Sequence, residues 1–240
     1  MISIELDRGS NRYDHQRLER RRWFLRWLIK QYVVRFMVKF DWVQGLQNLP
    51  ENDPAVLIIN HIAFFDPIVV MHVLPRNIVP VSKAEGIYNP IFGIALRLWQ
   101  VIPLHRREVD RQALRLISDV LAAGQMVLMA PEGTRHPTLQ RAKVGVAYVA
   151  YRNVVPVVPI AIDGTEGFPT LNQKRWRQPG ATICIGEPFM FKPRVHRPNG
   201  SQLRKMTDEA MYILAKMLPP HRRGVYADLT LATTDTISFL

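Results

Sequence analysis

The segment NHIAFFDP, residues 60–67, contains a histidine and an aspartate five positions apart, His61 and Asp66. Such a pair is suited to general acid–base chemistry, because the carboxylate can orient the imidazole and stabilise its protonated form. Five residues turn an α-helix about 140° beyond one full turn, and an odd spacing on a strand puts two side chains on opposite faces. The two groups can therefore meet only if the chain bends between them.

The sequence on either side of the pair predicts such a bend. The apolar run AVLIIN, residues 55–60, is typical of a buried strand. The run DPIVVMHVL, residues 66–74, predicts a helix with Asp66 as its N-cap and Pro67 at its first helical position. His61 would then lie at the carboxyl end of a strand, where α/β folds bind ligands. The structural alternative is that His61 only packs near the apolar run and Asp66 only caps the helix.

Charged and polar side chains follow three more predicted strands. They are Glu132, Thr134 and Arg135 in APEGTR, Arg106 in VIPLHR, and Lys83 in VSKAEG. At the same edge as His61, the three cations could hold a phosphate through charge-assisted hydrogen bonds worth about 1.5–3 kcal/mol each. Taken singly, each of these segments is also compatible with a plain turn that carries solvated charges.

The order of elements predicts the fold class. Further strands are expected at 78–82, 100–104, 126–130, 154–162 and 182–186, and further helices at 110–124, 141–152 and 201–218. Strands that alternate with helices indicate an α/β fold with a largely parallel central sheet flanked by helices. We divide the chain into an N-terminal basic and aromatic helical segment (1–45), an α/β domain (46–225) and a tail (226–240) that forms an edge segment or stays loose.

The N-terminal segment has an uneven charge. The whole chain carries a formal charge of +12, and residues 1–40 hold ten Lys/Arg against four Asp/Glu, a local excess of six. Within the aromatic stretch 23–40, each of four basic residues would cost about 2.5–3.5 kcal/mol at the centre of a membrane-spanning helix. We therefore expect a helix that lies in the membrane interface on anionic phospholipid, with no secretory signal and no transmembrane span. The alternative is an ordinary helix packed on the core.

Several familiar chemistries lack their motifs. The sequence contains no G-x-S-x-G elbow, Walker A loop, G-x-G-x-x-G fingerprint or H-E-x-x-H pair. Its single cysteine, Cys184, lies in a predicted strand and excludes a disulfide framework or a cysteine-built metal site. A histidine base without an enzyme nucleophile indicates that the base acts on a substrate hydroxyl.

Four blocks together resemble a known family. In this order, NHIAFFDP, SKAEGIYNPIFGIALRLWQVIPLHR, PEGTR and VPVVPIAI resemble the blocks of the glycerolipid acyltransferases, the lysophosphatidic acid and glycerol-3-phosphate acyltransferases. The resemblance implies that His61 is the general base and that Asp66 orients it. It also assigns Arg106, Glu132, Gly133 and Arg135 to the acceptor site and Lys83 to the acceptor phosphate.

The resemblance further implies the acyl donor and an N-terminal segment that docks on a membrane, and the remaining expectations complete this interpretation. The donor would be acyl-CoA or acyl-carrier protein, and no metal or bound cofactor would be needed. The protein would sit on the cytoplasmic face of a membrane, without a nucleic-acid partner. Given the cations and the membrane-suited N-terminus, the expected acceptor is 1-acyl-sn-glycerol 3-phosphate, which would give phosphatidic acid.

Other acceptors and functions stay open at this point. Glycerol 3-phosphate, another lysophospholipid and a glycolipid or aminolipid are alternative acceptors. Gly86, Ile87, His136 and the missing phenylalanine before Lys143 depart from the family pattern, and they bear on substrate identity rather than on reaction type. A hydrolase and a non-catalytic module that binds anionic lipid or nucleic acid through the basic N-terminus are the rival functions.

Overall fold

The computed structural model describes residues 15–88, 93–105, 110–193 and 197–240. Its centre is one mixed sheet with the strand order β1-β7-β6-β2-β5-β3-β4, extended by β8 on β6 and by β9 on β8. The strands are β1 Phe40–Gln44, β2 Ala55–Ile59, β3 Ile78–Lys83, β4 Ile102–Leu104, β5 Met126–Met129, β6 Val157–Asp163, β7 Ala181–Ile185, β8 Phe189–Phe191 and β9 Ile237–Phe239. The block β6-β2-β5-β3-β4 is parallel throughout, whereas β7 and β8 run antiparallel to β6. The predicted α/β class with a largely parallel sheet is confirmed.

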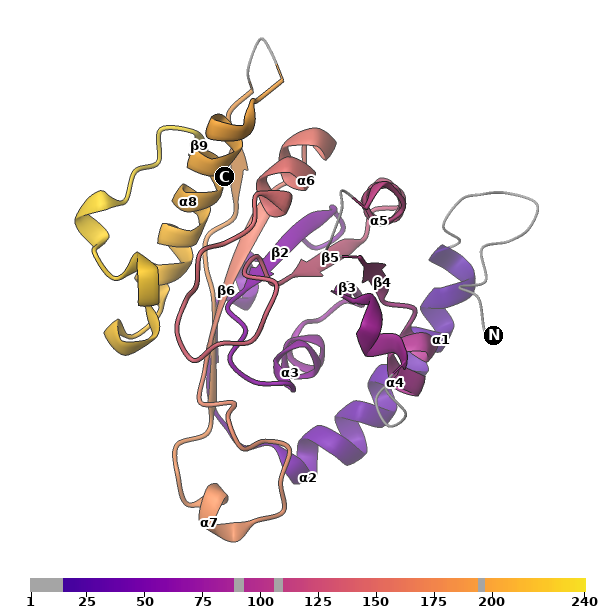
Figure 1. Ribbon diagram of the computed structural model, residues 1–240. Helices are drawn as coiled ribbons and strands as arrows, with labels where there is room; N and C mark the ends of the chain where they lie inside the picture. The colour runs from indigo at the N-terminus through magenta and orange to yellow at the C-terminus, as the bar shows by residue number, and fades with distance from the viewer. Residues whose placement is uncertain (1–14, 89–92, 106–109, 194–196) are drawn as a thin grey trace.

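Helices lie on both faces of this sheet (Figure 1). They are α1 His15–Leu28, which continues through the π-helical turn η1 Ile29–Val34 into α2 Arg35–Met37, and then α3 Asp66–Val73, α4 Gly93–Trp99, α5 Arg111–Ala122, α6 Gly145–Asn153, α7 Gln173–Trp176 and α8 Gly200–Met217. Short 3₁₀ turns occur at Leu46–Asn48, Ala84–Tyr88, Pro220–Arg222, Gly224–Tyr226 and Leu229–Leu231. Within the described residues, no helix is both long and apolar enough to cross a membrane.

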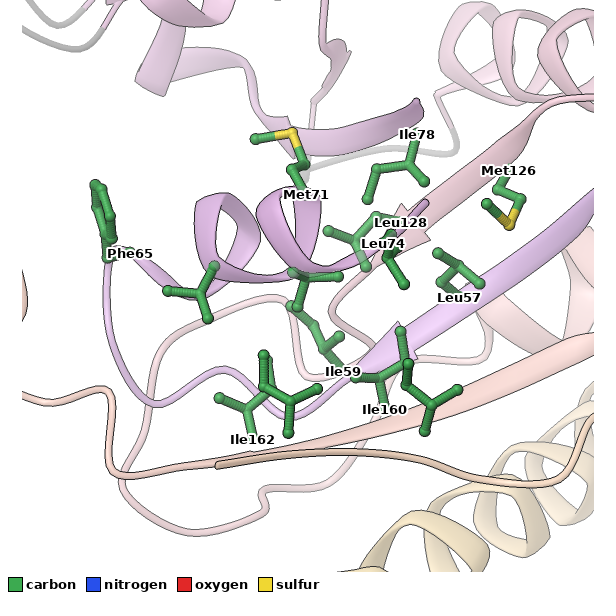
Figure 2. Close-up of a cluster of buried hydrophobic side chains, with 14 of the residues drawn as sticks. Leu57, Ile59, Phe65, Met71, Leu74, Ile78, Met126, Leu128, Ile160 and Ile162 are labelled. Atoms are coloured by element: carbon green, nitrogen blue, oxygen red, sulfur yellow. The ribbon is translucent and has the colours of Figure 1, made fainter. Parts of the chain in front are cut away.

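The alternation of β2 explains why both faces are covered. Leu57 and Ile59 belong to a buried cluster with α3 and the N-terminal helical segment, whereas Val56 and Ile58 belong to a second cluster with α5, α6 and α8. Figure 2 shows side chains of the first cluster gathered beside α3. A strand that is buried on both faces needs apolar residues at every position, and all five residues of β2 are buried. The core therefore holds the carboxyl end of β2 rigidly.

Most element boundaries agree with the sequence patterns, and the differences have local causes. Asp110 caps α5, the helix predicted from residue 110, by accepting from the backbone N–H of Ala113 at 2.9 Å. The strand predicted to begin at residue 154 begins at Val157, because Val154 has a φ of +51° and ends α6. The helix predicted from residue 141 begins only at Gly145, because the N–H of Lys143 donates to the carbonyl of Pro131 at 2.9 Å.

The two ends of the described chain join the sheet. Residues 40–44, predicted as part of an N-terminal helical segment, form β1 and pair with β7. Phe40 and Val43 pack against the buried core, and this packing favours the strand. In the tail, β9 pairs with β8, so the edge-segment alternative applies.

Arginines hold the N-terminal helix on the body of the protein. Arg21 Nε donates to the carbonyl of Leu98 at 2.6 Å, and Arg22 Nε donates to that of Trp99 at 2.9 Å. Arg26 Nη1 reaches the carbonyl of Pro75 at 3.0 Å. Cations are favourable at helix C-termini, where carbonyls lack partners within the helix. The three arginines therefore hold α1 against α4 and against the segment after α3. The sequence analysis had included their charges in the excess expected to bind anionic lipid.

Candidate active site

The turn after β2 brings His61 and Asp66 together. His61 Nδ1 lies 2.9 Å from Asp66 Oδ2, and the Asp66 side chain is fully buried while that of His61 keeps 19% of its exposure. An ionised carboxylate only accepts hydrogen bonds, so Nδ1 must carry the proton and Nε2 is the basic nitrogen. The bend that the spacing required is thus present.

Asp66 anchors this turn and does not cap α3. The N-cap of α3 is Phe65, which makes no side-chain cap, so the predicted cap at Asp66 is wrong, and Pro67 is the second residue of the helix rather than the first. The carboxylate points back along the chain, where Oδ2 also accepts from the N–H groups of Ile62 and Ala63 at 2.8 Å each. These donors offset the cost of burying the charge.

Two residues that the sequence analysis missed support the pair. Asn60 is buried and bridges β2 to β6, because its Nδ2 donates to the carbonyl of Ile162 and its Oδ1 accepts from the N–H of Ile162, both at 2.8 Å. Thr165, just beyond β6, donates from Oγ1 to Asp66 Oδ1 at 2.5 Å. A polar residue that ends an apolar strand was a visible signal for Asn60, but no local pattern links Thr165 to a residue 99 positions away.

The loop after β5 is joined to the His61 turn. Gly133 has a φ of +71°, a conformation that favours glycine, and its N–H closes a turn on Ala130. Glu132 Oε2 accepts from the N–H of Gln140 at 2.6 Å, and its carboxylate also accepts from the N–H of His61. In return, the N–H of His136 donates to the carbonyl of His61 at 2.9 Å.

Glu132 is not a solvated turn charge. Only 5% of it is exposed, and its Oε1 has no hydrogen-bond partner within the described part of the chain. Burial raises the pKa of Glu132 to about 7, against the lowering effect of the two backbone N–H groups. Near neutral pH this carboxyl therefore exists in both protonation states.

Two of the three predicted cations, Arg135 and Lys83, lie at or beyond the carboxyl ends of the neighbouring strands β5 and β3. Arg135 is exposed, and its guanidinium lies 5.4 Å from the ring centroid of Phe64, between the two members of the pair in sequence. Thr134 is exposed on the same loop. Lys83 ends β3, which is separated from β2 by β5 and hence by roughly 10 Å across the sheet. Arg106 lies outside the described residues. Among the described residues, Lys83 makes no hydrogen bond to His61 or Asp66.

A surface hollow of about 840 Å³ lies at the other edge of the sheet. Its lining includes Pro54 and Pro156, which precede β2 and β6, and none of the predicted site residues. Because parallel strands bind ligands beyond their carboxyl ends, the candidate site is the His61 edge and not this hollow.

Comparisons with known proteins show the family to which the chain belongs. The model of the Acyltransferase family matches residues 42–163, and the chain belongs to that family. Among its relatives, a chloroplastic 1-acyl-sn-glycerol-3-phosphate acyltransferase of Brassica napus is 35% identical over 182 residues, which are 73% of this chain and 50% of the relative. A 1-acyl-sn-glycerol-3-phosphate acyltransferase of Chlamydomonas reinhardtii is 32% identical over 189 residues, which are 75% of this chain and 53% of the relative. The chain thus spans about half the length of these curated relatives.

A solved structure has the same fold. The crystal structure of the 1-acyl-sn-glycerophosphate acyltransferase of Thermotoga maritima superposes with a TM-score of 0.58 at 22% identity. The match covers 92% of this chain and 86% of that one. At this identity the likeness concerns the arrangement of the elements, which includes an N-terminal helix and the mostly parallel sheet.

Proposed function

We propose that this chain is an O-acyltransferase that moves a fatty acyl group from a thioester to the free hydroxyl of 1-acyl-sn-glycerol 3-phosphate. The product would be phosphatidic acid. The observation that carries the proposal is the His61–Asp66 contact at Nδ1, which leaves Nε2 as a base at the carboxyl end of β2. The names of the relatives from Brassica napus and Chlamydomonas reinhardtii support this acceptor.

The proposed reaction is a direct transfer in which His61 acts first as a base and then as an acid. Nε2 takes the proton of the acceptor hydroxyl while that oxygen attacks the thioester carbonyl carbon. The tetrahedral intermediate collapses, the carbon–sulfur bond breaks, and the imidazolium returns the proton to the leaving thiolate. Asp66 stays ionised and stabilises the imidazolium. This scheme needs no metal or bound cofactor, and its donor is acyl-CoA or acyl-carrier protein.

We assign the acceptor side of the site to the loop after β5 and to two further cations. Arg135 is exposed and held beside the His61–Asp66 turn by Phe64, which suits it to an anionic head group. Lys83 and Arg106 are the other proposed phosphate ligands. Glu132 and Gly133 shape the loop that carries Thr134 and Arg135.

An acceptor screen tests this function. The full chain is given one acyl-CoA, and separately the same acyl chain on acyl-carrier protein, with a panel of acceptors. The panel comprises 1-acyl-sn-glycerol 3-phosphate, glycerol 3-phosphate, a neutral lysophospholipid and a glycolipid or aminolipid acceptor. Products are identified by mass, and free fatty acid is measured in parallel. We expect phosphatidic acid from the first acceptor and no transfer by the His61→Gln control.

The other outcomes each contradict a part of the proposal. Preferred acylation of another acceptor would show that the assigned substrate is wrong. Free fatty acid as the main product would indicate a hydrolase. A folded protein that binds lipid vesicles but transfers nothing to any acceptor would indicate a lipid-binding module.

We also propose that α1 and η1 dock the protein on the cytoplasmic surface of a membrane that contains anionic lipid. Five aromatic residues within the stretch 23–36 are 41–63% exposed: Trp23, Phe24, Trp27, Tyr32 and Phe36. Tryptophan and tyrosine favour the membrane interface. The neighbouring α4, which α1 contacts through Arg21, adds the exposed apolar residues Ile94 and Leu98.

Point substitutions test this docking better than a deletion. Removing residues 1–40 would also remove Arg22, which is 1% exposed and bound to the carbonyl of Trp99. The double variant Trp23→Ala/Trp27→Ala should float less with anionic vesicles than the wild type does. Binding of the wild type to these vesicles should weaken with salt. The matched control Val225→Ala/Leu231→Ala removes exposed apolar residues from the C-terminal segment, on the other side of the molecule from α1 (Figure 1). Equal flotation of all variants would show that the surface is assigned wrongly.

A further inference from the structure

The buried hydroxyl of Thr165 touches the His61–Asp66 pair from a distant part of the chain. Thr165 has no exposed surface, and its Oγ1 donates to Asp66 Oδ1 at 2.5 Å. It lies after β6, so the contact exists only because β6 pairs with β2 in parallel and brings both carboxyl ends to one edge. We propose that Thr165 is a positioning residue for the acyl transfer. It is the third member of a chain of hydrogen bonds, Thr165–Asp66–His61, that holds the imidazole in its working orientation.

The two oxygens of Asp66 have separate partners. Oδ2 receives the His61 ring and the N–H groups of Ile62 and Ala63. Oδ1 receives Thr165. A carboxylate rotates easily about the bond to its Cβ, because this torsion has broad minima. The hydroxyl on Oδ1 restricts that rotation and thereby keeps Oδ2 in line with His61 Nδ1.

The backbone around Thr165 is itself clamped. Arg175 donates to the carbonyls on either side, from Nη2 to Gly164 at 2.6 Å and from Nε to Glu166 at 2.7 Å. The guanidinium of Arg175 also lies 3.9 Å from the ring centroid of Phe168, which follows in the same loop. A clamped backbone fixes the position of the Thr165 Cβ, so the hydroxyl can hold the carboxylate rather than follow it.

A second histidine–aspartate pair in the same chain provides a comparison. His105 and Asp110 have the same spacing and the same Nδ1–Oδ2 distance of 2.9 Å, again just after a strand and before a helix. There the other carboxylate oxygen caps α5 at Ala113, and the histidine side chain is 70% exposed. The spacing and the His–Asp distance therefore do not distinguish the two pairs. Burial and the hydroxyl on the second oxygen do.

The test uses three substitutions and two measurements. Only the first measurement, the rate of acyl transfer, rests on the proposed function. Thr165→Val removes the hydroxyl at nearly constant volume, Thr165→Ser restores it, and Thr170→Val is the control in the same segment, where the hydroxyl accepts from Asn172 and does not touch the pair. We expect kcat of Thr165→Val to fall by about 10- to 100-fold, as for the loss of one hydrogen bond to a charged group. Because the proposed role of Thr165 is to act through Asp66 and not on substrate, the KM of donor and acceptor should change by less than about twofold.

The second measurement does not depend on turnover. In NMR spectra, the Nδ1–H proton of His61, identified by its loss in His61→Gln, reports the contact with Asp66. We expect this signal in the wild type, in Thr165→Ser and in Thr170→Val, and its loss or displacement in Thr165→Val. If Thr165→Val does not fold, as judged by its unfolding transition, Thr165→Ala replaces it with the same expectation.

The outcomes separate this inference from the proposed function. Normal kcat together with an unchanged Nδ1–H signal in Thr165→Val would overturn the positioning role. An equal loss of kcat in Thr170→Val would also overturn it, because the effect would then belong to the segment as a whole. If the wild type transfers no acyl group to any acceptor, the proposed function fails, and the Nδ1–H signal alone decides whether Thr165 holds the pair.

Discussion

Glu132→Gln isolates the effect of one buried carboxyl on the pH dependence of folding. Glu132 is 5% exposed, and burial raises its pKa from 4.5 to about 7. Glutamine resembles the protonated acid in shape, keeps an oxygen that can accept from the N–H of Gln140, and does not ionise. Any difference in pH dependence between the two proteins therefore reports the ionisation of Glu132.

The sign follows from the direction of the shift. Because the folded pKa lies above the unfolded value, the folded protein retains a proton that the unfolded chain has lost, and folding stability declines as pH rises between about 4.5 and 7. A shift of this size corresponds to about 3 kcal/mol in total, and about 2–3 kcal/mol of it falls between about pH 5 and pH 8. The contribution is fully present below the unfolded pKa and is lost above the folded one.

Urea unfolding at these two pH values measures the effect. We expect the free energy of unfolding of the wild type to fall from pH 5 to pH 8 by about 2–3 kcal/mol more than that of Glu132→Gln. Glu51→Gln, at an exposed position, is the control and should follow the wild type. Parallel pH profiles for the wild type and Glu132→Gln would refute the reasoning, because they would show that the carboxyl ionises alike in the folded and unfolded states.

Three further substitutions test other contacts. Asp66→Asn should fold, and urea unfolding should show a loss of about 1–2 kcal/mol in stability, because the amide oxygen can still receive three donors. Acyl transfer should fall by at least about 10²-fold, because the negative charge that stabilises the imidazolium is lost. Near-normal turnover would show that Asp66 has only a structural role. The same substitution in the serine protease triad lowers kcat by about 10⁴, which is an upper guide. Arg135→Gln should reduce kcat/KM for the phosphate-bearing acceptor by about 10- to 100-fold with little change in donor KM, and equal loss with a phosphate-free acceptor would contradict a phosphate ligand. Glu209→Gln should destabilise the C-terminal segment by about 1–3 kcal/mol, since this buried carboxylate accepts from Thr233, Asp235 and Thr236. Hydrogen exchange of the backbone amides in β9 should then accelerate. Unchanged exchange would show that β9 is held by its strand pairing alone.

The sequence by itself determined the strands β2 to β7, the helices α3, α5, α6 and α8, and the bend between His61 and Asp66. These features are encoded locally. The run AVLIIN is typical of a strand that is buried on both faces, Asp110 marks the start of a helix, and a five-residue spacing requires a turn if the pair is to meet. Polar residues at the ends of successive strands also indicated the correct edge of the sheet for Glu132 and Arg135.

Only the tertiary structure decided which neighbours these residues have. The pairing of β6 with β2 brings Thr165 to Asp66, and the loop after β5 buries Glu132 against the N–H of His61. The carbonyls at the end of α4 take up Arg21 and Arg22, which the charge count had placed at the membrane. The physical reason is the same in each case. A hydrogen bond or a buried charge depends on atoms within a few ångströms, and residues far apart in sequence reach that distance only when the sheet is assembled.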